Sequence, residues 1–417
     1  MSAENNEDRL KSLREALKDT INKYFDGRYE ILELCLSVVT QMFIEGMTLP
    51  FFLILVGPPS SFKTTILSIV SVLENTYRVD SFTAKAFVSH MANATEEDLK
   101  QRDLLPKIKD KTLITPELGP LFSTKDDKLQ EIIGILTRIL DGKGYTSESG
   151  ARGKRGYVGD YYFTWLGAAV KIPRRLWKVI SDLGPKMYFA VLYVKQVTDE
   201  EKQKAILENL RDIPYNDKLE QAKARLLDFW KELIATMLKS GKVKWDDSRN
   251  DKDTISKITM LAMLLGKLRA SMSTEDVPYH GGSNYNFEPP VIEDPTRATD
   301  SLINLAKGHA LLYGRNYIMP DDLRPVVKIA LSSASRERVG LFQFLIEKGG
   351  SQTTDQVMEK FKVGRDTALK YMKELELIGL VERDSQSTIT KPTIVIRLKE
   401  FYQWLLSDEF RSYWNDS

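Results

Sequence analysis

The segment that most constrains this chain is an apolar strand followed by a glycine-proline turn and a helix. Residues Phe51 to Val56 form an unbroken apolar run, which is typical of a strand buried on both faces of a parallel sheet. The turn GPPSSFKTT follows, and the apolar segment from Ile66 to Leu73 suits a helix that begins at the hydroxyl residues. This order of strand, loop, Lys-Thr pair and helix predicts a phosphate-binding loop.

The chemistry of such a loop assigns roles to its residues. Backbone N–H groups surround an anion, a lysine neutralises the β- and γ-phosphates, and a hydroxyl ligates Mg²⁺. Lys63 and Thr64 take these two roles, so we expect ATP and Mg²⁺ as cofactors. Phe62 stands where the usual pattern has a second glycine, and its side chain must point away from the phosphates. The alternative is an ordinary strand-to-helix turn with Lys63 in solvent. The predicted nucleotide-binding residues are Gly57, Pro58, Pro59, Ser60, Ser61, Phe62, Lys63, Thr64 and Thr65.

Length and composition bound the class of protein. A chain of 417 residues is too long for one small core and suggests two or three domains. Its 60 basic and 58 acidic residues nearly cancel, so any nucleic-acid surface must be local. The single cysteine, Cys35, excludes a disulfide scaffold and cysteine-based metal sites. The N-terminus has no signal pattern and no apolar run is long enough to span a bilayer, so we expect a soluble, cytoplasmic protein without membrane contact.

Strand and helix signals alternate around the loop. Apolar positions at helical spacing predict helices over Asn5 to Lys23 and Tyr29 to Glu45. Tyr77 to Asp80 and Phe82 are strand-like, and another helix follows Thr95, which suits an N-cap. The alternation predicts an α/β core with a parallel sheet and flanking helices.

A second informative segment is TLITPELGPLF. Thr112 to Ile114 predicts a short buried strand that ends at Thr115, Pro116 and Glu117. An acidic residue at such a strand end holds Mg²⁺ and polarises the attacking water in P-loop ATPases. Only Glu117 is available here, because Pro116 occupies the preceding position. The alternative is an acid that interacts with a helix N-terminus.

A glycine-rich basic stretch follows a helix predicted over Lys128 to Leu140. Six glycines lie between Gly142 and Gly159, and Tyr161 to Leu166 is strand-like. The stretch predicts a projecting hairpin that contacts DNA phosphates without reading bases, and the alternative is a solvated surface loop. Its basic residues are Arg152, Lys154 and Arg155.

These segments, with FTWLGAAV and EDPTRATDSLINLAKGHALLYGRNYIMPDDL, resemble the core of an AAA+ ATPase over roughly Met47 to Leu331. Within that group the chain is most similar to the MCM-like helicase branch, which inserts a hairpin before its sensor 1 strand and carries a sensor 2 arginine in a helical lid. The resemblance makes Lys63 and Thr64 the Walker A residues, Glu117 the Walker B acid and Arg297 sensor 2.

The resemblance also implies a sensor 1 strand and an arginine finger. The strand would be Tyr161 to Val170, although Ala169 and Val170 stand where such strands usually end in a polar residue. The finger would reach the γ-phosphate of a neighbouring subunit, so the resemblance implies a homo-hexamer or another ring. The candidates for the finger are Lys186 and, as rivals, Arg174 and Arg175.

The later part of the core reads as helical. Asp199 to Lys239 predicts a charged connecting element, and Tyr279 to Pro290 predicts a loop because it is rich in Gly, Asn and Pro. Helices over Thr296 to Leu312 and Asp321 to Ser333 then complete a helical lid.

The last unit has the layout of a winged-helix domain. Helices are predicted over Leu341 to Lys348, Thr354 to Phe361 and Arg365 to Ile378. Two strand-like pieces, Leu380 to Arg383 and Thr388 to Leu398, follow with Asp384 to Ser387 between them. The third helix of such a domain can enter the major groove of DNA, while Glu374 and Glu376 favour the alternative of a protein-docking domain. The candidate DNA contacts are Arg365, Lys370 and Lys373.

The predicted organisation is a helical lead-in (1–46), an AAA+ nucleotide-binding core with the basic hairpin (47–198), a connector and lid (199–338) and a winged-helix DNA-binding domain (339–417). The predicted function is an ATP-driven helicase or translocase that moves on DNA, and replication of a mobile or extrachromosomal element fits the resemblance. The alternative is a nucleotide-switched initiator or transcription regulator with weak or no hydrolysis.

Overall fold

The computed structural model forms two compact units. The first unit comprises Met1–Pro173, Pro185–Asp251 and Asn304–Pro325, and the second comprises Arg174–Gly184, Lys252–Ile303 and Val326–Ser417. The structure describes residues 3–89, 95–149, 153–183, 186–192, 198–201, 203–204, 207, 213–238, 241–279, 282–386 and 393–414.

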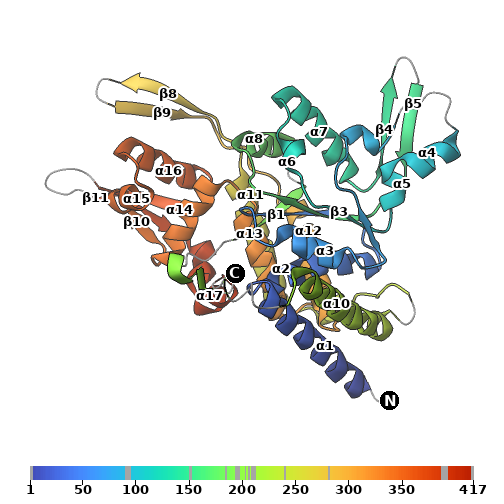
Figure 1. The fold of residues 1–417 in the computed structure, drawn as a ribbon. Helices are drawn as coiled ribbons and strands as arrows, with labels where there is room; N and C mark the ends of the chain where they lie inside the picture. Colours follow the sequence, from blue (N-terminus) through green and yellow to red (C-terminus); the bar gives the residue numbers. More distant parts are fainter. Residues whose placement is uncertain are drawn as a thin grey trace. The chain divides into compact units, whose positions relative to one another are not determined.

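A five-stranded parallel sheet organises the first unit (Figure 1). Its strands are β1 (Phe51–Val56), β2 (Thr76–Arg78), β3 (Thr112–Thr115), β6 (Thr164–Ala169) and β7 (Met187–Val191), in the order β2-β3-β6-β1-β7. Because all five run in one direction, the carboxyl ends of β1, β6 and β3 meet at one edge. The prediction of an α/β core with a parallel sheet is confirmed.

The interior of this sheet explains the apolar runs in the sequence. Every residue of β1 and β6 is buried, so neither strand shows a polar face. The Trp165 ring stacks on Phe52, with centroids 3.9 Å apart. A Cβ atom at Gly167 would lie 2.4 Å from the Leu118 Cδ1, so the Leu118 side chain occupies the space that glycine leaves on β6.

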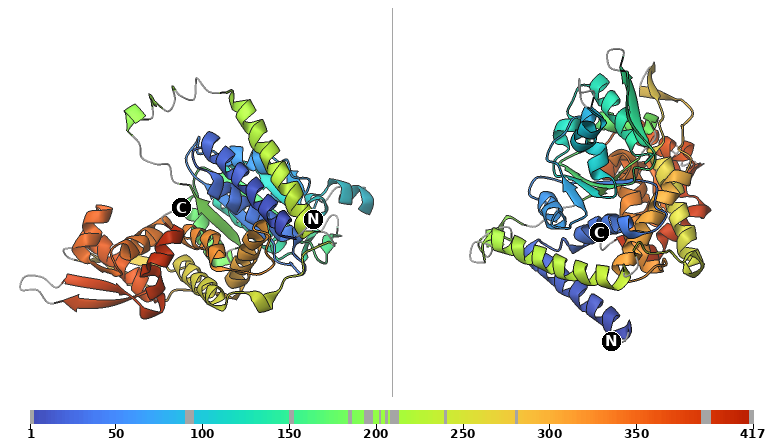
Figure 2. Two further views of the ribbon diagram at one scale, coloured as in Figure 1. Left: turned by 90° about the horizontal axis from the view of Figure 1, so that it is seen from below. Right: turned by 90° about the vertical axis from the view of Figure 1, so that its right-hand side faces the viewer.

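Helices flank the sheet. The longer ones are α1 (Ala3–Tyr24), α2 (Tyr29–Thr40), α3 (Lys63–Val70), α7 (Asp126–Ile139) and α10 (Tyr215–Met237), and the shorter ones are α4 (Glu96–Arg102), α5 (Leu104–Ile108) and α6 (Gly119–Phe122). Helix α4 begins after Thr95, which is its N-cap as predicted, and the Thr95 side chain also forms a capping box with Asp98. Helix α1 lies alongside α10 in both views (Figure 2). The connecting element predicted over Asp199 to Lys239 is α10 in its later part, and much of its earlier part lies outside the described residues.

The basic hairpin is present as an antiparallel pair, β4 (Gly144–Ser149) and β5 (Gly153–Val158). Two of its glycines are required by close backbone approach. A Cβ atom at Gly144 would lie 2.2 Å from the Tyr157 carbonyl oxygen, and one at Gly156 would lie 2.1 Å from that of Tyr145. The glycine pattern that predicted the hairpin therefore reports its tight pairing.

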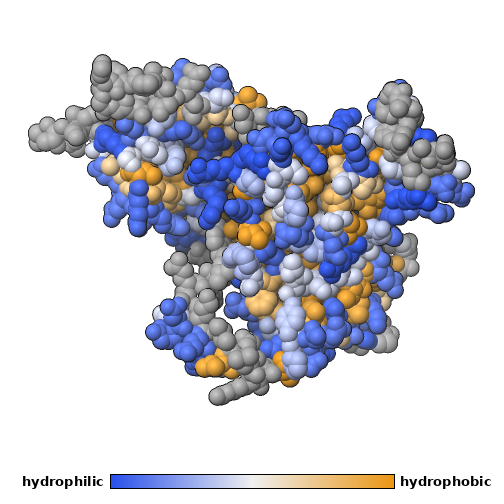
Figure 3. Space-filling view, turned by 45° about the horizontal axis from the view of Figure 1, so that its top comes forward, coloured by the Kyte–Doolittle hydropathy of each residue, from blue (hydrophilic) through white to orange (hydrophobic). Residues whose placement is uncertain are grey.

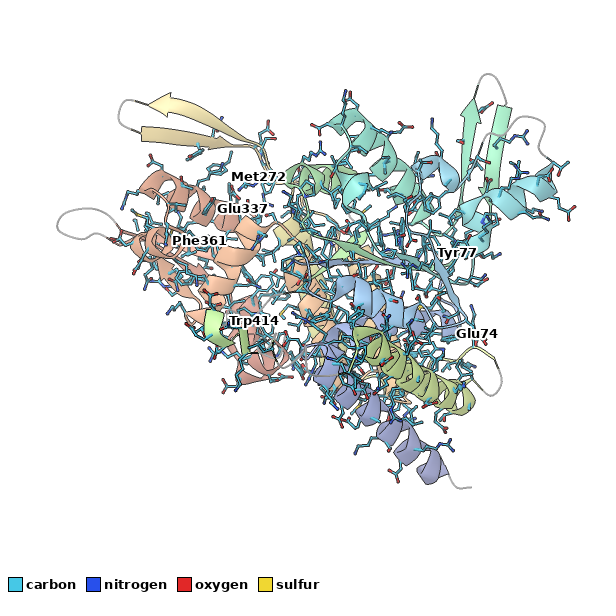
Figure 4. The ribbon with its side chains drawn as sticks, viewed as in Figure 1. Glu74, Tyr77, Met272, Glu337, Phe361 and Trp414 are labelled. Carbon is cyan, nitrogen blue, oxygen red and sulfur yellow. The ribbon has the colours of Figure 1, made fainter. Side chains whose placement is uncertain are left out.

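Two strands of the five-stranded sheet have boundaries that differ from the prediction. Strand β2 is a three-residue edge strand around Tyr77 (labelled in Figure 4), and it does not reach Phe82. The Phe82 ring instead packs on Phe87 and Trp165, each at 5.4 Å, so its apolar character serves the core. Strand β6 begins at Thr164, three residues after the predicted start at Tyr161.

The second unit contains α8 (Arg174–Leu183), α11 (Lys252–Arg269), the first part of α12 (Thr296–Leu312) and most of α13 (Leu323–Ser332). The two helices predicted for the lid correspond to α12 and α13. Helix α12 has the predicted bounds, and α13 begins two residues later than predicted.

The prediction of a loop over Tyr279 to Pro290 is wrong. Strands β8 (Thr274–Tyr279) and β9 (Gly282–Phe287) form an antiparallel hairpin instead. The alternation of Asn284 and Asn286 with Tyr285 and Phe287 is the strand signal. Asparagine and glycine are depleted in strands, so their abundance masked it.

The C-terminal segment contains α14 (Arg336–Glu347), β10 (Ser351–Thr353), α15 (Thr354–Phe361), α16 (Arg365–Leu377), β11 (Val381–Gln386) and β12 (Thr393–Leu398). The three helices are confirmed, with α14 starting five residues before the prediction. The strands form a three-stranded sheet in the order β10-β12-β11. This sheet differs from the two predicted strands in two ways: β10 was not predicted, and β11 extends over residues 384–386. Residues 388–392, part of the second predicted strand, lie outside the described residues. Helical turns η5 (Glu400–Leu406) and α17 (Asp408–Trp414) follow.

Apolar residues are scattered among hydrophilic ones on the face shown in Figure 3. Among the residues described, no helix combines the length and the apolar character needed to cross a membrane.

Candidate nucleotide-binding site

The loop between β1 and α3 has the strained backbone of a phosphate-binding turn. Phe62 lies in the left-handed region, with φ +64°, and Ser60 has φ +61°. This region favours glycine, which explains why the usual pattern has glycine at the Phe62 position. The Phe62 ring packs edge-on against Phe25, with centroids 5.8 Å apart, so packing on the residue after α1 fixes the direction of its side chain.

The Lys63 ammonium lies inside the loop. It donates to the carbonyl oxygens of Gly57 at 2.8 Å and Pro58 at 2.7 Å, and to the Ser61 Oγ at 3.1 Å. Lys63 is only 6% exposed, so the alternative of a lysine in solvent is wrong. Burial lowers the pKa of Lys63, and the nearby charge of Glu117 opposes this shift. A buried cation held only by neutral oxygens is a favourable place for an anion.

The two threonines at the start of α3 have different surroundings. Thr64 is exposed, so its hydroxyl is accessible to a metal ion. Thr65 is buried, and its Oγ1 shares a hydrogen bond of 2.8 Å with the hydroxyl of Tyr215, the first residue of α10. Tyr215 is 150 positions away in the chain, and no local pattern in the sequence pointed to it.

Glu117 lies just beyond the carboxyl end of β3. Its Oε1 accepts the backbone N–H of Gly119 at 2.7 Å, at the start of α6, and the side chain is exposed. A Cβ atom at Gly119 would lie 2.5 Å from that oxygen, so a larger residue at this position would displace the Glu117 carboxylate. Glu117 therefore interacts with the start of a helix, and its charge also acts on Lys63. Its role at Mg²⁺ and at the attacking water stays a prediction.

The carboxyl end of β6 is tied to both neighbouring segments by backbone hydrogen bonds. Leu118 N–H donates to the Ala168 carbonyl at 2.8 Å, and Gly57 N–H donates to the Ala169 carbonyl at 3.2 Å. Ala169 is buried and Val170 is 44% exposed. Strand β6 therefore positions the P-loop and the segment carrying Glu117, but its last residues offer no polar side chain.

The donors near the loop suit magnesium bound together with a nucleotide. A threonine hydroxyl and a carboxylate are oxygen ligands, and Mg²⁺ usually takes one or two such groups plus substrate phosphates. Thr64 and Glu117 are of these two ligand types, and their role at a metal ion stays a prediction. Among the described residues, no group of three or more His, Cys, Asp or Glu side chains is arranged to hold a metal ion.

The basic hairpin presents its cations on two faces. Lys154 is exposed and pairs across the hairpin with Glu148, while Arg155 is partly buried and pairs with Ser147. Neighbouring residues of a strand point to opposite faces, so these two cations do not share one. Arg152 lies outside the described residues.

The finger candidates already have partners within their own units. Lys186 donates to the Asp141 Oδ1 at 2.5 Å and to the Thr137 carbonyl at 2.8 Å. Arg174 forms an ion pair of 2.8 Å with Glu337 (labelled in Figure 4), although its side chain stays 90% exposed. The trans-acting role of Lys186, Arg174 or Arg175 stays a prediction.

Arg297, the sensor 2 candidate, lies in the first turn of α12 in the second unit. Its charge acts on Glu293, whose pKa is raised by burial and is partly brought back by Arg269 and Arg297. The role of Arg297 at a nucleotide stays a prediction.

The candidate DNA contacts on α16 are partly engaged within the second unit. The Lys370 Nζ lies 4.8 Å from the ring centre of Tyr285 on β9, and Lys373 forms an ion pair of 2.8 Å with Glu376. Arg365, the first residue of α16, is partly exposed. The β8-β9 hairpin thus contacts the helix expected to face DNA.

Tyr371, on the same helix as these cations, serves packing. Its ring lies edge-on to Phe361 (labelled in Figure 4), with centroids 6.5 Å apart, and Phe361 in turn packs on Phe344 at 6.0 Å. These rings join α16 to α15 and α14.

A buried charged cluster in the first unit escaped the sequence analysis. The His309 Nδ1 lies 2.7 Å from the Asp322 Oδ1, and its Nε2 lies 3.8 Å from the Glu33 Oε2. Asp322 also accepts from Arg315 at 2.9 and 3.0 Å, and Tyr313 donates to Glu33 at 2.7 Å. The cluster joins α2 to the second half of α12.

Comparisons with known proteins support part of this picture. Residues 294–338 match the AAA lid domain family. The fold is an α/β AAA+ core with a helical lid. The lid match and the parallel sheet with its flanking helices support a P-loop ATPase of the AAA+ type.

No curated protein matches the chain. Among solved structures, the apo C-terminal region of NrS-1 has 13% identity and a TM-score of 0.24, over 92% of this chain and 76% of that one. The Aeropyrum pernix Orc1 protein in complex with DNA has 14% identity and a TM-score of 0.25, over 92% of this chain and 93% of that one.

Proposed function

We propose that this protein binds ATP with Mg²⁺ at the loop from Gly57 to Thr65 and uses hydrolysis to move on DNA, as an MCM-like helicase or translocase. The observation that carries the proposal is the buried Lys63 ammonium, held by loop carbonyls and coupled to the charge of Glu117. ATP would supply the phosphoryl group for hydrolysis. Lys63 would bind its β- and γ-phosphates, the Thr64 hydroxyl would hold the metal, and Glu117 would orient the attacking water.

DNA contact is proposed at two places. The β4-β5 hairpin offers exposed Lys154 and partly exposed Arg155, which can contact phosphates and release them. The segment from α14 to β12 has the element order of a winged-helix domain, with α16 as the helix that would face the duplex and Arg365 at its start. A ring, with a hexamer as the expected form, would bring a finger from one subunit to the P-loop of the next.

A second candidate is a nucleotide-switched DNA-binding initiator or regulator, in which ATP controls assembly and hydrolysis is slow. Two observations favour it. The Glu117 carboxylate already accepts the Gly119 N–H, and β6 ends in apolar Ala169. Both reduce the polar groups available to activate water.

ATP turnover with and without DNA tests the proposal. A motor should hydrolyse ATP many times faster when single- or double-stranded DNA is added, and Lys63→Ala should abolish that activity. Turnover that is slow and indifferent to DNA, together with ATP-dependent assembly in size-exclusion chromatography, would support the switch instead. Arg365→Ala should weaken duplex binding and reduce its salt dependence if α16 contacts phosphates.

A further inference from the structure

The proposed phosphate site leaves one neighbouring aromatic side chain without a role. Tyr215 begins α10, and its hydroxyl is 2.8 Å from the Thr65 Oγ1. The residue is 51% exposed, although its hydroxyl is held against the start of α3. An exposed ring anchored by its polar end presents a fixed aromatic surface beside the loop.

Buried aromatic packing supports this ring. Phe25 is fully buried and contacts Tyr215 edge-on, with centroids 6.5 Å apart. The same Phe25 ring contacts Phe62, the loop residue with a left-handed backbone, at 5.8 Å. Phe25 therefore links the shape of the loop to the position of Tyr215.

The order of groups along a nucleotide determines which part would meet Tyr215. In a P-loop the lysine contacts the β- and γ-phosphates, and the following hydroxyl residue holds the metal between them. The backbone N–H of Thr65, the third residue of α3, is another of the free donors at the helix start. The Thr65 N–H would therefore donate to the α-phosphate. The ribose and base are attached to that phosphate, so they would lie near the side of the loop that Tyr215 contacts.

We propose that the exposed face of Tyr215 stacks on the base of the bound nucleotide and favours a purine. The proposal rests on the proposed nucleotide site. It assigns Tyr215 as a specificity-determining residue and Phe25 as a positioning residue that holds it. Stacking suits a purine because its two fused rings offer more surface than a pyrimidine.

The Thr65 hydrogen bond gives this contact a second consequence. It ties the ring to the segment whose N–H groups surround the phosphates. Removing the whole ring should strongly weaken the binding of the base, because the stacking surface is lost. Removing only the hydroxyl should weaken it slightly, because the ring remains and only its tie to Thr65 is lost. Tyr215→Ala and Tyr215→Phe form a matched pair that separates these two effects.

The test measures the affinities of ATP and CTP for the full chain by calorimetry, in the wild type and in three variants. These two nucleotides carry the same triphosphate and ribose, so their ratio isolates the base. We expect the wild type to prefer ATP, and Tyr215→Ala to bind ATP roughly tenfold to a hundredfold more weakly and to lose most of that preference. Tyr215→Phe should keep the preference. Lys63→Ala should lose both nucleotides, and its failure to do so would overturn the nucleotide site itself.

A photolabelling experiment measures proximity directly. With 8-azido-ATP, irradiation of the wild type should label the segment that contains Tyr215, and excess ATP should suppress the label. Unchanged ATP affinity and preference in Tyr215→Ala, or labelling confined to other segments, would overturn the stacking contact while leaving the phosphate site intact. Equal losses of ATP and CTP in Tyr215→Ala would also overturn it, because they would show that Tyr215 acts only through Thr65.

Discussion

The Phe62 ring packs on Phe25 at 5.8 Å while the Phe62 backbone lies at φ +64°. The ring contact stabilises the fold, whereas the positive φ costs free energy because Phe62 carries a Cβ atom. The loop thus keeps a backbone shape for which phosphate-binding loops use glycine, and aromatic packing stabilises it.

Two substitutions at Phe62 separate these terms. Phe62→Ala removes the ring and keeps the unfavourable φ, so we expect a loss of about 1 to 2 kcal/mol in the free energy of unfolding. Phe62→Gly loses the ring but relieves the backbone, so its stability should lie within about 1 kcal/mol of the wild type. Thermal unfolding compares the two variants. ATP affinity should survive in Phe62→Gly, and its loss there would mean that the ring itself forms part of the nucleotide pocket.

Lys63→Ala should weaken ATP binding at least tenfold, which corresponds to about 1.4 kcal/mol. The reason is the loss of the buried ammonium that would bind the phosphates. Calorimetric titration measures the effect, and Lys125→Ala, which removes an exposed lysine at the start of α7, is the matched control. Wild-type affinity in Lys63→Ala would exclude this loop as the ATP site.

Glu117→Gln should retain ATP and slow turnover by roughly a hundredfold or more, the scale of a general-base contribution. The amide oxygen of glutamine can still accept the Gly119 N–H, so the turn before α6 should persist. Steady-state ATPase rates are the measurement, with Glu131→Gln as a control on the exposed face of α7. Equal rates in wild type and Glu117→Gln would indicate that any hydrolysis is incidental, as the switch candidate requires.

The buried cluster at His309 should make stability depend on pH. Burial acts to lower the pKa of His309, but hydrogen bonds and charges from Asp322 and Glu33 raise it to about 9, against 6.5 for a free histidine. A raised pKa in the folded state contributes stability that is complete below about pH 6.5 and is lost as the pH rises through about 9.

The matching variant is His309→Gln. It should lower the free energy of unfolding by a few kcal/mol near pH 6, and by less above pH 9. Glu33 has the opposite dependence. Burial raises its pKa, but His309 and Tyr313 lower it by more, so the pKa in the folded state lies below the ordinary value. The stability that Glu33 contributes is therefore lost as the medium becomes acidic. Denaturant unfolding between pH 5 and pH 10 covers both limits of the His309 contribution. A difference between wild type and His309→Gln that stays constant over this range would exclude a charged His309.

The sequence predicted elements where local pattern and final environment agree. The apolar run from Phe51 to Val56 matches β1 residue for residue, and α15 has its predicted bounds. The β8-β9 hairpin was missed because Asn284 and Asn286 carry loop propensity on a strand. The hairpin is stabilised by the pairing of β8 with β9 and by the contact of Tyr285 with Lys370, neither of which is a local feature of the sequence.

The candidate site was predictable only in part, for a related reason. Lys63, Thr64 and Glu117 belong to motifs whose residue spacing predicts their chemical roles. The contact of Thr65 with Tyr215 joins residues 150 positions apart, and that of Tyr313 with Glu33 joins residues 280 apart. Neither contact follows from a periodicity, because the packing of α10 and α12 in the folded chain creates it.

The basic hairpin decides between motor and switch. Lys154 and Arg155 project to different faces of β5, so a strand of DNA running past the hairpin can meet one or the other. Changing both to Ala should abolish DNA stimulation of the ATPase and any strand separation, because phosphate contacts that form and release are what movement along DNA requires. ATP affinity should not change, since neither residue belongs to the P-loop.

A control with the same loss of charge is Lys125→Ala combined with Lys128→Ala, which removes two exposed lysines from the region of the α7 start. This control should retain DNA stimulation, because those residues lie outside the hairpin. DNA-stimulated ATPase and fluorescent unwinding assays compare the two double variants with the wild type. Normal unwinding by the Lys154 and Arg155 double variant would make the hairpin a solvated surface loop, and the initiator or regulator candidate would then be preferred.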